Sequence, residues 1–162
     1  MLAVCDAAAS PAALRSGTVL SKYRIKLAGR LALLHLEGRT PADADDVSGE
    51  VEVIVQEMLD TLSEKDTVVR FSAAKYLARI SERLPSDMAG DVAGALLDMF
   101  ERAFDEVDTA ERILQGSCLA FAELARRGRV PPELVARLVE CALKVSGFPW
   151  ALLAFAPELL SG

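Results

Sequence analysis

The sequence predicts an all-α fold in which antiparallel helix pairs stack into an α-solenoid. The first observation is an internal repeat: residues 64–70 (EKDTVVR) return 42 positions later as residues 106–112 (EVDTAER), with Glu, Asp, Thr and Arg kept. The second is that the same shift aligns apolar positions on both sides of this segment at helical spacing. The third is that period-two alternation, typical of strands, is nearly absent. A period of roughly 40–47 residues is typical of HEAT and armadillo repeats, so we expect a solenoid of that type.

The repeat reaches into the helices that flank the shared segment. Before it, four apolar residues of one helix face match four others: Ile54, Val55, Met58 and Leu62 with Leu96, Leu97, Phe100 and Phe104. After it, Ala74 and Leu77-Ala78 match Gly116 and Leu119-Ala120. A weaker third copy lies at a shift of 46, where Arg24-Ile25, Ala28 and Leu31-Ala32 match Arg70-Phe71, Ala74 and Leu77-Ala78. That copy lacks the acidic connector, because Thr18 and Leu20 replace Glu64 and Asp66.

The first predicted helix covers residues 18–36 and ends before Gly38. Its apolar residues, with basic residues between them, are Leu20, Ile25, Leu27, Leu31 and Leu34. Residues 39–49 contain a proline and three aspartates and little to bury, so we expect a surface loop there.

The clearest repeat follows this loop. Its first helix is predicted over 50–63, with Glu50 and Glu52 near the positive end of the helix dipole. Asp66 is a suitable N-cap for a second helix over 67–84, which Pro85 ends.

The next repeat contains predicted helices over 86–104, capped by Ser86, and over 109–127, stopped by Gly128. Prolines 131 and 132 suit the start of a further helix over 132–143. Its partner should carry an acidic connector near 148 and an arginine near 154, but the chain has Phe148-Pro149-Trp150 and Ala154.

We therefore predict one solenoid segment over 1–162, with three to four repeats, of which the last is incomplete. Repeat-like sequence covers 18–144, and 145–162 form a divergent apolar tail. We expect this tail to fold back imperfectly near 149–155 and to leave an adhesive end.

Composition excludes several classes of function. Hydrophobic residues make up 52% of the chain and charged residues 26%, which suits helices with broad apolar faces. The formal charge of −6 disfavours a phosphate-binding basic face. Three widely spaced cysteines (Cys5, Cys118 and Cys141) predict neither a disulfide framework nor a metal pair, which fits a reducing cytosol. Residues 2–13 lack a basic leader, and no apolar stretch reaches the length of a membrane span, so we expect no targeting signal.

Arg70 and Arg112 are the first candidates for chemistry, because an arginine can stabilise a phosphate. Each lies four residues after an aspartate and six after a glutamate, namely Asp66 and Glu64 in one repeat and Asp108 and Glu106 in the other. Such spacing favours local hydrogen bonds that tie the connector to the second helix. We interpret these six residues as structural connectors of the repeats.

Other candidates are weaker. His35 is the only histidine, so the chain cannot supply a histidine-based triad or a multi-histidine metal site. Cys118 falls on an apolar helix face, where thiols are usually buried and unreactive. The aspartates 43, 45 and 46 lack the glycine and distal glutamate of a calcium loop, and glycine-rich phosphate loops are absent, so we expect no metal and no cofactor. The basic cluster of Arg126, Arg127 and Arg129 either complements a helix C-terminus or forms a partner-binding patch.

Three groups of separated phrases, in order along the chain, carry a family resemblance. They are residues 65–70, 72–75 and 83–85, then Asp91-Val92, Gly94, Leu97-Asp98 and Phe100, and finally Gly116, residues 118–120, 122–124 and 126–128. Together they closely resemble the family of tubulin-folding cofactor D, also called tubulin-specific chaperone D. The resemblance runs from about residue 18 to about residue 144. Members of this family are long HEAT-repeat proteins, and this chain would correspond to an internal part of such a solenoid.

The resemblance implies a non-catalytic chaperone segment that binds β-tubulin, assists assembly of the αβ-tubulin heterodimer and contributes to activation of the tubulin GTPase. The implied partners are β-tubulin, tubulin cofactors C and E and an Arf-like small GTPase, in a cytoplasmic, microtubule-associated setting. The alternative within binding proteins is a general HEAT adaptor or scaffold unrelated to tubulin. A small helical enzyme would need clustered acids, bases or metal ligands, and the sequence supplies no such set.

Overall fold

The computed structural model describes residues 11–37, 49–105 and 109–145, with side chains from residue 17 onward. The helices in chain order are α1 (Pro11–Leu36), α2 (Gly49–Thr61), α3 (Thr67–Ser81), α4 (Ser86–Arg102), α5 (Ala110–Ala125) and α6 (Pro132–Lys144), and a short 3₁₀ turn, η2 (Ala103–Asp105), extends α4. No strand occurs within these three ranges. The predicted all-α class is therefore confirmed.

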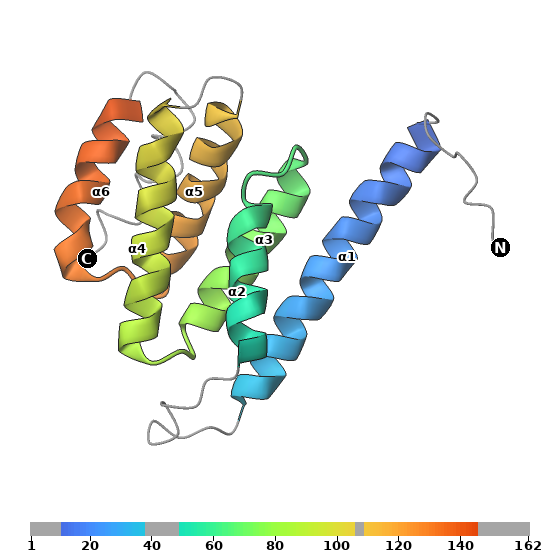
Figure 1. The fold of residues 1–162 in the computed structure, drawn as a ribbon, viewed down its shortest axis with the longest axis horizontal. Coiled ribbons are helices and arrows are strands. Elements are labelled where there is room, and N and C mark those ends of the chain that lie inside the picture. Colours follow the sequence, from blue (N-terminus) through green and yellow to red (C-terminus); the bar gives the residue numbers. More distant parts are fainter. Residues whose placement is uncertain (1–10, 38–48, 106–108, 146–162) are drawn as a thin grey trace.

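Alternate helices stack side by side. Helix α3 packs between α1 and α5, so these three form one continuous layer (Figure 1). Helix α2 packs on α1 and α3, α4 packs on α5, and α6 packs on α4. The most extensive contacts join α1 to α3 and α3 to α5, which are equivalent helices of successive pairs, and α2 to α3 and α4 to α5, which are the two helices of a pair. This is the arrangement of a HEAT or armadillo solenoid.

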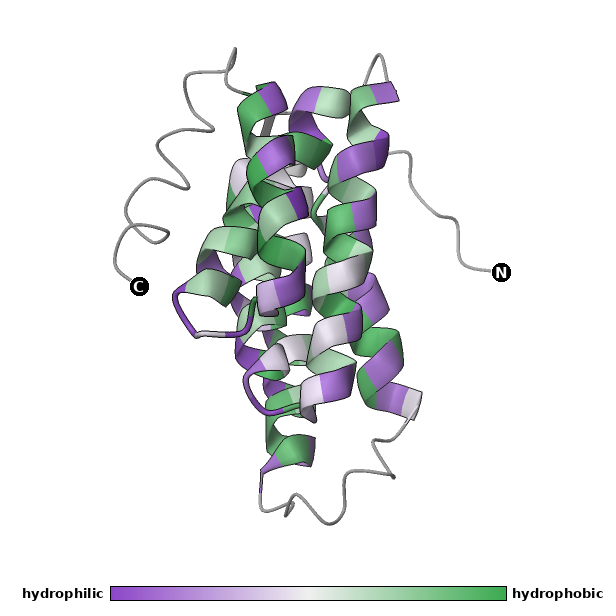
Figure 2. Cartoon of the chain, turned by 90° about the vertical axis from the view of Figure 1, so that its left-hand side faces the viewer, coloured by the Kyte–Doolittle hydropathy of each residue, from purple (hydrophilic) through white to green (hydrophobic). Residues whose placement is uncertain are grey.

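Most of the apolar residues that the repeat matched in and directly after α2 and α4 lie in the core, but Phe104 is exposed, and Ile54 and Val55 are only partly buried. Seen from the α6 side, hydrophobic and hydrophilic bands alternate along the helices (Figure 2), as expected for helices with apolar faces. Met58 and its repeat equivalent Phe100 are both fully buried. Phe100 also contacts Phe121 of α5 edge to face, with ring centroids 6.3 Å apart. The aromatic side chains at these positions thus join α4 and α5, the two helices of one pair.

Two local predictions can be compared directly with the helix starts. The Asp66 cap is confirmed, because its carboxylate accepts hydrogen bonds from the amides that open α3. The predicted Ser86 cap is wrong: Pro85 occupies the N-cap position of α4, and no side chain caps this end. Pro85 has the extended backbone of an N-cap residue, and its carbonyl accepts the amide of Ala89 at 2.9 Å. Ser86 is consequently the first residue inside the helix, one position too late for capping.

Helix α1 begins earlier and carries two apolar faces. It starts at Pro11, where the sequence predicted a start at residue 18. One face is buried against the neighbouring helices and contains Ile25, Ala32, Leu33 and Leu36. Of the apolar residues that the sequence analysis assigned to this helix, only Ile25 lies on the buried face. The four leucines lie on the other side and are more than half exposed: Leu20, Leu27, Leu31 and Leu34. This second face distinguishes α1 from the enclosed helix α3.

Several predicted features lie outside the described residues. They are most of the 39–49 loop with its aspartates, the connector residues Glu106 and Asp108, and the tail beyond residue 145. The adhesive-end hypothesis for the tail therefore stays a prediction.

The approach of α5 to the end of α2 depends on a glycine. A Cβ atom built on Gly116 would lie 2.0 Å from the carbonyl oxygen of Leu62. Real Cβ atoms do not come so close to a backbone atom, so any side chain here would push the two segments apart. The repeat-equivalent position in α3 holds Ala74, which is fully buried.

We predict that Gly116→Ala lowers the free energy of unfolding by about 1–3 kcal/mol, since it overpacks a backbone contact. Gly94→Ala is the matched control, because nothing lies within 4 Å of a Cβ at that helical position. There the gain in helix propensity should stabilise the chain by up to about 1 kcal/mol. Urea denaturation followed by circular dichroism measures both, and equal effects of the two substitutions would contradict the close approach.

Candidate functional site

The connector between α2 and α3 is held by the side chain that opens α3. The carboxylate of Asp66 accepts hydrogen bonds from the amides of Val68 at 2.8 Å and Val69 at 3.3 Å. The first amides of a helix have no acceptor within the helix, so the carboxylate provides one and adds favourable charge at the positive end. The amide of Val69 also donates to the backbone carbonyl of Asp66 at 3.1 Å.

Arg70 joins this connector to the next repeat. Its Nη1 donates to the carbonyl oxygens of Glu64 and, at 3.0 Å, of Lys65, and its Nη2 donates to the hydroxyl of Thr67 at 2.9 Å. Nη2 also donates to the side-chain oxygen of Gln115 on α5. Only 3% of Arg70 is exposed. One buried guanidinium therefore bonds to the α2–α3 connector, to the start of α3 and to α5 of the next pair.

Burial affects the electrostatics of this group. Desolvation lowers the pKa of Arg70 from its ordinary value, and Arg112 adds to this, whereas Asp66 opposes it. Arg112 is half-buried, and its own connector residues, Glu106 and Asp108, lie outside the described residues.

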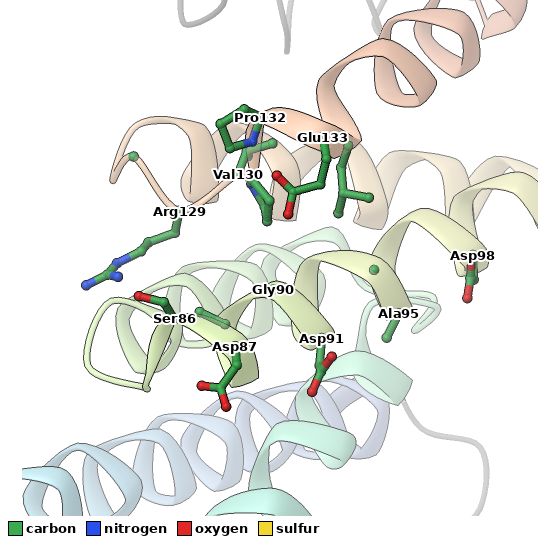
Figure 3. Close-up of a pocket in the computed structure, with 15 residues that line it drawn as sticks. Ser86, Asp87, Gly90, Asp91, Ala95, Asp98, Arg129, Val130, Pro132 and Glu133 are labelled. Atoms are coloured by element: carbon green, nitrogen blue, oxygen red, sulfur yellow. The ribbon is translucent and has the colours of Figure 1, made fainter. Parts of the chain in front are cut away.

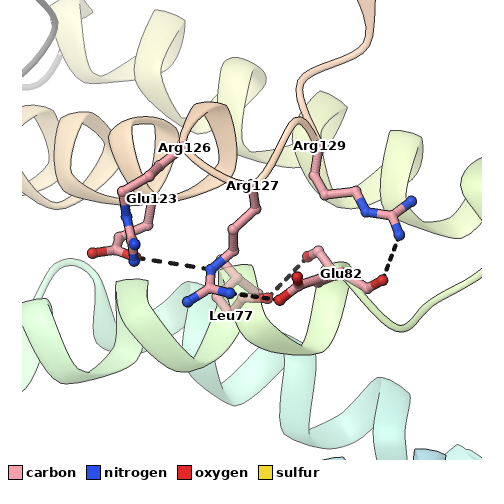
Figure 4. A network of polar contacts seen from close by, with 7 residues as sticks. Leu77, Glu82, Glu123, Arg126, Arg127 and Arg129 are labelled. Carbon is pink, nitrogen blue, oxygen red and sulfur yellow. Dashed lines mark hydrogen bonds and ion pairs between the residues drawn. The ribbon is translucent and has the colours of Figure 1, made fainter. Parts of the chain in front are cut away.

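The basic cluster at the end of α5 is engaged within the chain (Figure 4). Arg126 forms an ion pair with Glu123 at 2.6 Å, and Arg127 forms one with Glu82 at 2.5 Å. Arg129 donates to the backbone carbonyl of Glu82. Glu82 follows directly after α3, so these contacts link the ends of two stacked helices. The arrangement bridges neighbouring repeats. It also pairs, within the chain, much of the positive charge that a partner-binding patch would need.

Gly128 makes this arrangement possible. Its φ of +63° lies in the left-handed region that favours glycine. The turn is closed by a hydrogen bond from the amide of Arg129 to the carbonyl of Leu124 at 2.9 Å. The chain thereby reverses within a few residues and brings Arg129 back towards α3.

A groove of about 860 Å³ lies between α4 and the connector that leads into α6 (Figure 3). Asp87, Asp91 and Glu133 give it an acidic lining, and Arg129 lies at one end. Gly90 and Gly94 place no side chains on the α4 wall of the groove. Neither histidine nor cysteine is among the described residues that line it.

A second groove, of about 300 Å³, separates α1 from α3. Its lining combines basic and aromatic or aliphatic residues, namely Lys22, Lys26, Val68, Phe71, Ser72, Lys75, Tyr76 and Arg79. Sequence reasoning missed this groove, because the lysines of α1 and the cations of α3 are far apart in the chain. The weaker repeat could have revealed the groove. Its shift of 46 makes residues 22–33 equivalent to 68–79, and equivalent helices of a solenoid lie side by side.

The remaining candidates for chemistry do not assemble. Cys118 is buried, and desolvation raises the pKa of its thiol to about 12, so the nucleophilic thiolate is not populated at neutral pH. Burial and the neighbouring Glu101 also raise the pKa of the Cys141 thiol. Within the described ranges, no three His, Cys, Asp or Glu side chains lie close enough to hold a metal ion. No described helix is long and apolar enough to cross a membrane.

These features define a class: the chain is an armadillo-type repeat protein whose surface offers grooves between stacked helices. The family can also be stated. Residues 37–149 match the sequence model of the family described as "Tubulin-specific chaperone D-like, ARM repeats". This match covers more than half of the chain, and the chain belongs to that family. Helix α1 lies outside the matched residues.

Two curated relatives agree with this assignment. The chain is 36% identical over 88 residues to "Tubulin-specific chaperone D" of Dictyostelium discoideum. It is 35% identical over 99 residues to "Tubulin-folding cofactor D" of Schizosaccharomyces pombe. The alignments cover 54% and 53% of this chain but only 6% and 9% of the relatives. The search of solved structures found no match.

We predict that Arg70→Ala lowers the free energy of unfolding by about 2–3 kcal/mol, because it removes several hydrogen bonds from a charged, buried group. Arg102→Ala is the matched control: Arg102 is exposed and, among the residues that the structure describes, bonds only to a carbonyl of its own helix. That control should change stability by less than about 0.5 kcal/mol. Thermal and urea unfolding measure both. If Arg70→Ala left stability unchanged but abolished partner binding, Arg70 would be a binding residue and not a structural connector.

We also predict an energetic coupling of about 0.5–1 kcal/mol between Arg127 and Glu82, as is usual for a partly exposed ion pair. A double-mutant cycle with Arg127→Ala and Glu82→Ala, followed by chemical denaturation, measures it. High salt should reduce the coupling. Strictly additive effects would mean that the pair does not stabilise the stack and leave Arg127 available to a partner.

Proposed function

We propose that the chain is a non-catalytic protein-binding segment of a tubulin-specific chaperone. The observation that supports this most is the family match over residues 37–149, since both curated relatives are named for tubulin chaperoning or folding. The fold agrees with it, because helix-pair solenoids bind other proteins through extended surfaces and inter-helix grooves.

The partner we propose is β-tubulin, and the role is to assist assembly of the αβ-tubulin heterodimer and to contribute to activation of the tubulin GTPase. Tubulin cofactors C and E and an Arf-like small GTPase are further proposed partners. A cytoplasmic, microtubule-associated location would follow from these interactions. This chain spans less than a tenth of its curated relatives, so it would supply one surface of a larger machine.

Within this proposal, the six connector residues of the two repeats have a structural role. Asp66 and Arg70 order one connector, and we propose that Asp108 and Arg112 order the other in the same way, with Glu64 and Glu106 at equivalent positions. The whole chain, 1–162, then acts as one repeat segment. Partner contacts fall on the helix surfaces between the connectors and not on the connectors themselves.

The experiment is a binding measurement with purified native αβ-tubulin. The intact chain is immobilised, and retention of tubulin is compared with retention of serum albumin, an acidic protein that controls for charge. We expect saturable binding of tubulin alone. The competing proposal, a general scaffold unrelated to tubulin, predicts no preference between the two proteins.

We predict that the purified chain hydrolyses no GTP by itself, since the described residues contain no cluster of His, Cys, Asp or Glu that could hold the metal ion on which phosphoryl transfer depends. Phosphate release is measured with GTP and magnesium, with and without tubulin, against a heat-denatured control. Turnover that co-purifies with the monomer in the absence of tubulin would contradict the non-catalytic assignment.

A further inference from the structure

The groove between α1 and α3 concentrates positive charge in an otherwise acidic chain. It is lined by Lys22 and Lys26 from α1 and by Lys75 and Arg79 from α3. The formal charge of the whole chain is −6, so four cations around about 300 Å³ are a local reversal of sign. Such a reversal produces a local field that attracts anions.

These four cations are not neutralised by the fold. Within the described ranges, none of them forms an ion pair, whereas Arg24, Arg83, Arg127 and Arg137 each pair with a glutamate. The contacts that the groove cations do make are with rings. The guanidinium of Arg79 lies 5.4 Å from the ring centroid of Tyr76, and the ammonium of Lys26 lies 5.9 Å from that of Tyr23. Contacts of this kind hold a cation in place without cancelling its charge.

Apolar side chains lie among the cations. Phe71 is 45% exposed and Val68 is 48% exposed, and both line the same groove. Aromatic residues and arginine are enriched at protein interfaces, so the exposed ring of Phe71 and the guanidinium of Arg79 fit a surface that binds a protein.

The repeat itself does not require these cations. Shifting Lys75 and Arg79 by 42 positions gives Ser117 and Phe121 on α5, and both are fully buried. The same architecture is therefore built there without charge. Lys75 and Arg79 therefore give the α1–α3 pair a positive charge that helix stacking does not require.

We propose that the α1–α3 groove binds a short acidic segment of a protein partner. Carboxylates of the segment pair with Lys22, Lys26, Lys75 and Arg79, and one aromatic or aliphatic side chain packs on Phe71 and Val68. This inference rests on the proposed protein-binding function and assigns to it a surface and a class of ligand.

The acidity of the rest of the chain favours a peptide over a nucleic acid. A polyanion that extends beyond the groove would meet a surface with a net negative charge and would be repelled. A short acidic segment places its charge only where the four cations lie. The exposed ring of Phe71 provides a contact for a side chain that neither a phosphate backbone nor a lipid headgroup carries.

The test uses the full chain and a fluorescein-labelled peptide of glutamates around one central phenylalanine, with fluorescence anisotropy as the readout. Two control peptides replace every glutamate by glutamine or by lysine. We expect the glutamate peptide to bind at least about tenfold more tightly than either control, and its affinity to fall with salt. Replacing the central phenylalanine by serine should also weaken binding.

Paired variants locate the site. Lys26→Gln with Lys75→Gln removes two groove cations, whereas Arg30→Gln with Lys65→Gln removes two exposed cations that do not line the groove. The first pair should weaken binding about tenfold, and the second should change it less than about twofold. Circular dichroism confirms folding, and the single variant Lys75→Gln, on an exposed side chain, replaces the first pair if that pair unfolds.

Three results would overturn the proposal: no saturable binding of the glutamate peptide, equal losses from the two variant pairs, or tighter binding of single-stranded RNA or anionic vesicles than of the peptide. The tubulin measurement separates this inference from the proposed function. If tubulin binds while the peptide does not, only the groove assignment is wrong; if neither binds, the protein-binding function is wrong as well.

Discussion

The structure depends on one buried charge at a turn between helices. Arg70 orders the α2–α3 connector through two backbone carbonyls and reaches Gln115 of the following pair through the same guanidinium. A planar group with five donors can satisfy several acceptors at once, which a lysine ammonium cannot do in this geometry. The cost of burying a charge is offset only while all of these acceptors are present. The register of α5 against α3 and the shape of the connector are consequently set together.

Close backbone contact makes this register possible. Gly116 follows directly after Gln115, and its lack of a side chain lets α5 approach the carbonyl of Leu62. The side-chain oxygen of Gln115 is thereby held where Arg70 can donate to it. The contacts of Arg127 and Arg129 with Glu82 fix the opposite ends of the same two helices. The bond of Arg70 to Gln115, the contacts of Glu82 with two arginines, and the close approach of Gly116 to Leu62 together define how the pairs stack.

Local chemistry was readable from the sequence, and contacts between distant residues were not. The six helices follow from apolar spacing, and the Asp66 cap follows from its place before α3, because both depend on residues only a few positions apart. The wrong prediction at Ser86 also concerns adjacent residues: Pro85, one position earlier, already has the backbone that a cap requires. The partners of Arg70 within the connector were implied by spacing. Its bond to Gln115 depends on which face of α5 is turned inward, and the pairing of Arg127 with Glu82 depends on the stacking of helices.

The position of α3 between α1 and α5 has a consequence for motion on slow timescales. In a stack of this kind each helix is protected only by its immediate neighbours, so opening proceeds from the ends inward. Both sides of α3 are covered, and its residues Ala73, Leu77 and Ile80 have no exposed surface. Its amide hydrogens should therefore exchange with solvent more slowly than those of α1, whose second apolar face is open. The groove between these two helices thus has one rigid wall, α3, and one wall, α1, that can open locally to admit a ligand.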